Sequence, residues 1–202
     1  MTRWQVFRAL PSAVRDPARL GDVAVLKSEL GGTRASAAVE RRLDPVRGFH
    51  PRVDLARLRR MPEGSFGRAF ARFLDDNGLS PFQPSTDLPA DMVARNAFVA
   101  RYGAIHDMVH VLLGFDATWA GEAGVWAFVG RQGYSGTFSV AGVASLLVAP
   151  LRSPLRLGAV WRAWRRGRAM APGARLLILE RLEDHLDRPL AEVRADLGIV
   201  VA

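Results

Sequence analysis

Residues 101–126 read RYGAIHDMVHVLLGFDATWAGEAGVW. The stretch is largely apolar, but it holds four side chains that can bind a metal, namely His106, Asp107, His110 and Glu122. The glycine of VLLG and the FDAT sequence after it favour the end of one helix, a turn and the start of another. The stretch therefore predicts a helix hairpin whose two arms carry the four polar side chains.

The spacing of these residues decides whether they can meet. On an α-helix His106 and His110 lie one turn apart, about 6 Å along the axis, and Asp107 comes three residues before His110. Glu122 would lie about 18 Å from His110 along a continuous helix, too far to share a ligand. The predicted turn reverses the chain, so Glu122, in the first or second turn of the next helix, can approach the two histidines.

Two imidazoles and two carboxylates form a donor set that binds zinc, iron or manganese. One carboxylate can instead accept a hydrogen bond from an imidazole N–H and fix the tautomer of that ring. The spacing alone also fits a polar groove in which the histidines bond only to nearby acids. Because the turn brings Glu122 back toward the histidines, we favour the metal site.

Two better-known motifs fit these residues less well. Metalloproteases with an HExxH motif carry a glutamate after the first histidine as general base, and here that position is Asp107, one methylene shorter. The adjacent His106–Asp107 pair also occurs in HD-type phosphohydrolases, which need further histidine and aspartate ligands. His50 and the acidic residues beyond position 180 are candidates for such ligands, but their spacing does not require it.

The composition restricts the possible partners. The chain of 202 residues has no cysteine, which excludes disulfides and thiolate ligands, and its formal net charge is +8. Lys27 is the only lysine, so almost all of the positive charge is arginine. Nucleic-acid binding would use such arginines, but acidic residues alternate with them along most of the chain. We therefore expect an ordinary arginine-rich surface and no nucleic-acid partner.

No stretch of the sequence predicts a membrane span. A helix needs about 18–20 consecutive apolar residues to cross a bilayer, and the nearest candidate, residues 137–151, is too short and contains Pro150. The first residues lack the apolar region of a signal peptide. We therefore expect a chain that is soluble or lies on a membrane surface.

Helical periodicity dominates the sequence and strand signals are weak, so we expect one all-α domain over residues 1–202. Ser65 suits a helix N-cap, and Asn77 with Gly78 suits a helix end. We expect helices over residues 21–43 with a break at 31–32, over 53–60, 66–76, 88–113, 119–132 and 137–149, and in two or three segments beyond residue 154.

The chain resembles the Coq4 family of ubiquinone biosynthesis proteins. That family carries HDxxH, eleven further residues and then a glutamate, and His106, Asp107, His110 and Glu122 match this pattern. The segment LRRMPEGSFGRAFARFLDDNGLSP, the RY pair before the histidines and the ending LERLEDHLDRPLAEVRADLGI are similar to family segments in the same order. The resemblance covers nearly the whole chain.

This resemblance implies a helical protein that acts near a membrane, with other quinone-biosynthesis proteins, on a polyprenylated quinone precursor. It implies that His106, Asp107, His110 and Glu122 hold a divalent metal and form the catalytic site. Zinc is the expected metal, with iron, manganese or magnesium as alternatives. The implied reaction is oxidative decarboxylation at C1 of a prenylated 4-hydroxybenzoate-type ring, by a lyase. The alternative is a non-catalytic scaffold that binds prenyl lipids and organises a quinone-biosynthesis complex.

Two segments are expected to serve a lipid substrate. Residues 137–149 have small apolar side chains and are expected to line an apolar channel, although an ordinary buried helix fits them as well. Residues 152–170 hold six arginines, no acidic residue and tryptophans on one helical face, which suits an anionic membrane surface. A helix that docks its tryptophans into the core is the alternative. We expect a cytoplasmic protein on the inner face of a membrane. A homodimer is one of the assembly states that the sequence leaves open.

Overall fold

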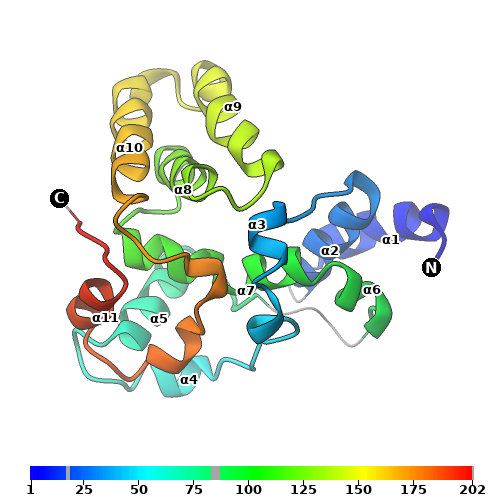
Figure 1. The fold of residues 1–202 in the computed structure, drawn as a ribbon, viewed down its shortest axis with the longest axis horizontal. Helices are drawn as coiled ribbons and strands as arrows, with labels where there is room; N and C mark the ends of the chain where they lie inside the picture. The colour runs from blue at the N-terminus through cyan, green and yellow to red at the C-terminus, as the bar shows by residue number, and fades with distance from the viewer. Residues whose placement is uncertain (17–18, 83–86, 202) are drawn as a thin grey trace.

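Helices make up all of the regular secondary structure over residues 1–16, 19–82 and 87–201, the part of the chain that this computed structural model describes (Figure 1). The predicted all-α class is therefore confirmed. The α-helices are α1 (Arg3–Arg15), α2 (Leu20–Gly31), α3 (Ala37–Glu40), α4 (Leu55–Leu58), α5 (Phe66–Asp76), α6 (Ala90–Arg95), α7 (Ala97–Leu113), α8 (Trp119–Arg131), α9 (Gly136–Arg152), α10 (Leu157–Met170) and α11 (Leu190–Asp196). Short 3-10 helices span Asp44–Val46, Pro154–Arg156, Leu177–Leu179 and Leu182–His185.

Helix α7 lies at the centre of the fold, with α2 and α5 packed against it (Figure 1). Thirteen of its seventeen residues are buried, so it is enclosed on nearly every side. A helix in that position is expected to be apolar all round. The two histidines within it are therefore exceptions that call for a functional or structural reason.

The helix predicted over residues 88–113 is wrong in one respect, because it is two helices that meet at Asn96. The backbone of Asn96 leaves the helical region, at φ −106° and ψ 24°. Its side-chain amide donates to the Met92 carbonyl at 3.0 Å and to the Glu29 carboxylate at 2.6 Å. Asparagine side chains compete in this way with the backbone bonds of a helix, which explains the break.

The end of α7 is held by charge as well as by backbone conformation. Gly114 has φ 65°, the left-handed conformation predicted for it as a helix end. Arg194 donates to the carbonyls of Val111 and Leu112 at 2.8 and 2.9 Å, and Arg166 donates to that of Gly114 at 2.7 Å. Cations are favourable at a helix C-terminus because the unpaired carbonyls carry partial negative charge. These bonds fix the point from which the chain turns into α8.

Helix α8 lies between α9 and α10 and packs closely against both. Gly124 of α8 and Gly167 of α10 meet without side chains between them: a Cβ atom on Gly167 would lie 2.0 Å from the Gly124 carbonyl oxygen. The two backbones therefore approach as closely as glycine permits. This contact sets the position of α8 relative to α10.

Helix α9 continues past Pro150, where the sequence predicted its end, and stops at Arg152. The last turn is closed by a hydrogen bond from the Ser153 N–H to the Ala149 carbonyl, at 2.8 Å. Proline removes one i→i−4 hydrogen bond and its ring crowds the preceding turn, and α9 ends two residues after Pro150. In the described part of the chain, no single helix is long and apolar enough to cross a membrane. Only residues 136–152 and 154–170 together meet that length and composition test, with a bend of 119° between them.

A buried ion pair joins α7 to the C-terminal segment. The Arg101 guanidinium contacts the Glu183 carboxylate with both terminal nitrogens, the longer contact being 2.9 Å, and both side chains are almost fully buried. Arg101 also donates to the Phe49 carbonyl at 3.0 Å. Arg101 therefore ties two segments that are distant in sequence, the loop at Phe49 and the segment at Glu183, to the helix that carries the histidines.

Candidate metal centre

His106, His110 and Glu122 converge, as the predicted helix hairpin requires. The two histidines lie one turn apart on α7, and Glu122 lies in the first turn of α8. The Glu122 carboxylate is 3.5 Å from His106 Nε2 and 3.4 Å from His110 Nε2. One ligand atom from each of the three residues lies within 4.8 Å of the others, so the group could hold a metal ion.

The start of α8 aims Glu122 at the histidines. Thr118 is the N-cap, and its hydroxyl accepts a hydrogen bond from the Gly121 N–H at 3.4 Å. Asp116 holds the cap in turn, because its carboxylate accepts from the Thr118 hydroxyl at 2.6 Å. The FDAT turn that the sequence indicated is therefore a capped helix start, and it places Glu122 one turn inside α8.

Asp107 is not among the three residues whose ligand atoms converge. Its carboxylate lies 3.1 Å from His106 Nδ1, on the opposite side of the imidazole from Glu122. A carboxylate at Nδ1 accepts the N–H there and leaves Nε2 free to bind a metal, an arrangement common around metal-ligating histidines. Asp107 therefore takes the position of an orienting carboxylate, and its role as a direct ligand stays a prediction.

The buried state of His110 fits a metal ligand. Its side chain is 1% exposed and stacks on the Phe73 ring, with ring centroids 5.3 Å apart. Its Nδ1 has no hydrogen-bond partner among the described residues, and Nε2 has only the Glu122 carboxylate at 3.4 Å, outside good hydrogen-bond geometry. Unpaired polar atoms in a protein interior are costly, typically about 1–3 kcal/mol. A metal bound at Nε2 would remove part of that cost, so the donor set suits the ion that it implies.

The ionisable groups of the site shift one another's pKa values. Burial alone would lower the pKa of His106, but the carboxylates of Asp107 and Glu122 outweigh burial and raise it to about 9. Burial alone would raise the pKa of Glu122, but the two histidines lower it to about 2. At neutral pH the metal-free site is therefore an ion pair, with Glu122 ionised and His106 protonated.

These shifts set the pH range in which the metal-free ion pair stabilises the fold. The raised pKa of His106 gives a contribution that is complete below the ordinary value of 6.5 and is lost as the pH rises toward about 9. The lowered pKa of Glu122 gives a contribution that is complete above 4.5 and is lost as the pH falls toward about 2. Both contributions are complete only between these ordinary values, at mildly acidic pH.

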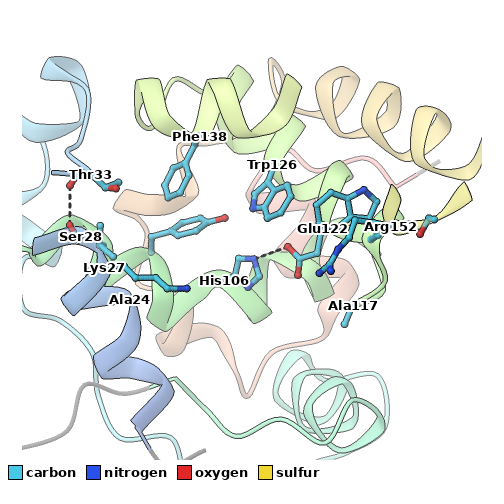
Figure 2. A pocket seen from close by; sticks show the side chains of 14 residues that line it. Ala24, Lys27, Ser28, Thr33, His106, Ala117, Glu122, Trp126, Phe138 and Arg152 are labelled. Carbon is cyan, nitrogen blue, oxygen red and sulfur yellow. Dashed lines mark hydrogen bonds and ion pairs between the residues drawn. The ribbon is translucent and has the colours of Figure 1, made fainter. Parts of the chain in front are cut away.

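A cavity of about 900 Å³ opens onto the candidate metal centre (Figure 2). His106 and Glu122 belong to its wall, while His110 lies behind them. Aromatic rings form much of the remaining surface. The lining residues are Ala24, Lys27, Ser28, Thr33, Val99, Tyr102, His106, Ala117, Trp119, Glu122, Trp126, Phe138, Arg152 and Ser153. The cavity is large enough for an aromatic ring with part of an apolar chain.

Residues 137–149 line this cavity only through Phe138. The sequence predicted that the whole segment would line an apolar channel. In the structure much of the outer face of α9 points to solvent, and Val140, Val143 and Leu147 are exposed. Composition did not distinguish a helix that borders a cavity from one whose apolar face lies on the surface.

Several residues of the cavity were not predicted from the sequence. Lys27 was notable only as the single lysine, and Arg152 only as part of a basic segment. Tyr102 lines the cavity beside His106, with the two ring centroids 5.4 Å apart, and burial raises the pKa of its phenol. Its position one turn before His106 was the available signal.

Comparison with known proteins identifies related chains. A sequence model of the family described as "Coenzyme Q (ubiquinone) biosynthesis protein Coq4" matches residues 49–202. The chain is 34% identical over 158 residues to the Bos taurus "Ubiquinone biosynthesis protein COQ4 homolog, mitochondrial", covering 73% of this chain and 56% of the relative. It is 35% identical over 162 residues to the protein of the same name from Xenopus tropicalis, covering 72% and 52%.

The fold has a counterpart among solved structures. A crystal structure from Nostoc punctiforme, described as that of a candidate ubiquinone biosynthesis protein, superimposes with a TM-score of 0.67. The match covers 97% of this chain and 94% of that one, at 21% identity, and it shows the shared fold. The chain spans about half the length of the curated relatives it matches.

Proposed function

The chain belongs to the Coq4 family of coenzyme Q (ubiquinone) biosynthesis proteins, and we propose that it binds a divalent metal and processes a polyprenylated ring precursor of that quinone. One observation carries the proposal. Three residues able to hold a metal, His106, His110 and Glu122, lie at a cavity of about 900 Å³ that is lined by aromatic side chains. Such a cavity suits an aromatic ring with an apolar tail, next to a metal.

Each residue of the site has a distinct part in this proposal. His106, His110 and Glu122 hold the metal. Zinc is the ion that the family resemblance implies, and two imidazoles with one carboxylate also suit iron, with manganese or magnesium as further alternatives. Asp107 accepts the Nδ1–H of His106 and keeps that ring in the tautomer that can bind. The buried wall around His110 excludes water from the inner side of the site.

The proposed reaction is oxidative decarboxylation at ring C1. A bound divalent ion would polarise the oxygens of the ring substrate and stabilise the negative charge that develops as CO2 leaves. The residues of the cavity position the ring and keep its apolar tail away from water. The reaction also consumes an oxidant, and zinc has no redox chemistry. The identity of the loaded metal therefore distinguishes Lewis-acid from redox assistance.

Metal analysis of the protein purified without a histidine tag and without chelator tests the proposal, beside the variant His110→Ala. We expect nearly one metal ion per chain in the wild type and a large loss in His110→Ala. Trp126→Phe is a matched control, because it alters the cavity and leaves the three ligands intact. If neither wild type nor control binds zinc, iron or manganese after refilling, the metal-dependent function is refuted.

The non-catalytic scaffold is separated from the enzyme by the behaviour of Glu122→Gln. In an enzyme this variant stays folded and loses turnover of a prenylated 4-hydroxybenzoate, because the ligand set is incomplete. In a scaffold the metal only joins α7 to α8. The variant is then less stable than the wild type, and neither protein has any turnover. Thermal unfolding and product analysis by mass spectrometry on the same samples therefore distinguish the two roles.

We also propose that the end of the α9–α10 hairpin rests on an anionic membrane, on the cytoplasmic side. The support is an unusual separation of charge. Residues 123–179 contain eight arginines and no acidic residue, while the rest of the chain holds 20 basic and 20 acidic residues. Basic residues beside exposed apolar side chains suit the surface of a membrane with anionic lipids.

The apolar part of this surface is at the connection between α9 and α10, which projects from the rest of the fold (Figure 1). Leu147, Leu151 and Leu155 are 77%, 85% and 98% exposed. Trp161 is also half exposed, while Trp164 donates to the Gly142 carbonyl at 2.7 Å and packs onto α9. The tryptophan face predicted from the sequence is thus divided between the interior and the surface.

Vesicle flotation tests this placement. The double variant Leu151→Glu/Leu155→Glu is expected to bind vesicles with anionic lipid at least about tenfold more weakly than wild type, because each leucine removed from water contributes about 1.5–3 kcal/mol. Trp4→Glu is the control, because Trp4 on α1 is also exposed and apolar and is therefore a competing membrane contact. If only Trp4→Glu weakens binding, the hairpin is not the membrane contact.

A further inference from the structure

Two cationic side chains line the cavity on either side of the candidate metal centre. Lys27 comes from α2, and Arg152 comes from the last residue of α9, 125 positions further along the chain. Figure 2 shows the Lys27 side chain extending along the cavity toward His106, with Arg152 on the other side, near Glu122. The two cations therefore flank the position at which a ligand would meet the metal.

Neither cation is neutralised within the part of the chain that the structure describes. No carboxylate oxygen of residues 1–16, 19–82 or 87–201 forms an ion pair with Lys27 or Arg152. Among the described residues that line the cavity, Glu122 is the only acidic one, and it lies 3.5 and 3.4 Å from His106 and His110. The cavity thus has two positive charges beyond those that its own carboxylate balances.

The position of Arg152 is held by an aromatic ring. Its guanidinium carbon lies 5.5 Å from the centroid of the Trp119 ring, within the range of a cation–π contact. Trp119 is itself fixed, since its indole N–H donates to the Ser145 carbonyl at 3.2 Å. This contact keeps the guanidinium at the cavity wall, although α9 ends beside solvent.

We propose that Lys27 and Arg152 form an anion subsite that binds the ring carboxylate of an amphipathic ligand. This inference rests on the proposed function and adds the part of the ligand that these two residues recognise. The tail of the ligand lies against the aromatic wall formed by Trp119, Trp126 and Phe138, and its anionic head lies between the cations, beside the metal. Hydrogen bonds between charged groups are about twice as strong as neutral ones, so the subsite selects for an anion.

The two cations differ in their position relative to the family match. The family match covers residues 49–202, so Lys27 lies outside the matched region, while Arg152 lies within it. Lys27 is the only lysine in the chain, so Lys27→Met removes the one lysine ammonium group that the cavity wall offers to a ligand.

Isothermal titration calorimetry of the zinc-loaded protein at pH 7 tests the subsite with three probes: 3-geranyl-4-hydroxybenzoate, the neutral 2-geranylphenol and geranyl phosphate. We expect the benzoate to bind about tenfold or more tightly than the phenol. Lys27→Met and Arg152→Met are each expected to weaken benzoate binding by about tenfold and to leave phenol binding unchanged. Lys27→Arg retains most of the affinity because it retains the charge.

Two variants serve as matched controls. Arg156→Met removes an exposed cation four residues after Arg152, outside the cavity wall, and Arg8→Met removes one on α1. Both lower the net charge by the same amount as the test variants. Benzoate binding as in the wild type in both controls would show that local position matters and net charge does not.

Each outcome decides the proposal. Equal binding of benzoate and phenol, or benzoate binding unchanged in Lys27→Met and Arg152→Met, overturns the subsite and leaves the proposed ring substrate standing. Geranyl phosphate as the only ligand, with binding lost in both variants, supports the subsite and overturns the ring substrate. If none of the three probes binds, the subsite and the proposed substrate class are both overturned.

Discussion

Alanine at position 167 would place a methyl group at the crossing of α8 and α10. The added Cβ atom would lie 2.0 Å from the carbonyl oxygen of Gly124 and 3.2 Å from its Cα atom. Both atoms belong to the backbone of α8, so no side chain can rotate away to make room. The two helices must therefore move apart, although α8 is packed against α9 on its other side.

The magnitude follows from two opposing effects. Overpacking of a dense interior costs about 1–3 kcal/mol, and more when the backbone itself must shift. Glycine-to-alanine substitution in a helix interior contributes a stabilisation of about 1 kcal/mol. We expect Gly167→Ala to lower the free energy of unfolding by about 2 kcal/mol. Because Glu122 lies only two residues before Gly124 on the same helix, metal affinity is expected to fall as well.

Gly158→Ala is the matched control on the same helix. The nearest obstacle to its methyl group is the Arg162 guanidinium, 3.3 Å away, and this flexible end can move. The control is therefore expected to gain about 0.5–1 kcal/mol from helix propensity alone. Urea titration followed by circular dichroism gives both free energies of unfolding. Equal stability of Gly167→Ala and Gly158→Ala would refute the argument that backbone contact at this crossing positions α8.

Two further predictions concern the metal site and the buried ion pair. Raising the pH from 6 to 8 is expected to strengthen zinc binding by about 100-fold, because the metal displaces one proton from His106, whose pKa is about 9 without metal. Competition with a chromophoric chelator measures the zinc affinity, and equal affinity at both pH values would contradict this prediction. Arg101→Met is expected to lower the free energy of unfolding by about 3–5 kcal/mol, because Glu183 loses its buried partner. Urea titration of Arg101→Met beside Arg57→Met checks this prediction. The control breaks an exposed ion pair with Asp187 and should cost under about 1 kcal/mol, so similar losses of stability in both variants would contradict the prediction.

The local elements were predictable from the sequence. Ser65 caps α5 through the Arg68 N–H, and Gly114 ends α7, as predicted. These features depend on contacts between residues a few positions apart, which the sequence displays directly. The break at Asn96 was missed because it also depends on Glu29, which reaches the asparagine from α2.

The candidate metal centre was predictable in part. His106 and His110 share a helix face, and the turn before α8 returns Glu122 to them, so local spacing was sufficient for these three. Asp107 follows His106 directly, and successive residues on a helix point about 100° apart. It therefore lies beside His106 Nδ1, away from the point where the other three meet.

By itself, the sequence determined the helix hairpin and the identity of its polar residues, because both depend only on the order of residues within the stretch 101–126. Only the tertiary structure brought Lys27 and Arg152 to one cavity, since helices distant in the chain must pack before these side chains share a wall. It also decided that the apolar face of α9 lies outside. An apolar helix is buried only where a neighbour covers it, and α9 has α8 on one side and solvent around Leu147 on the other.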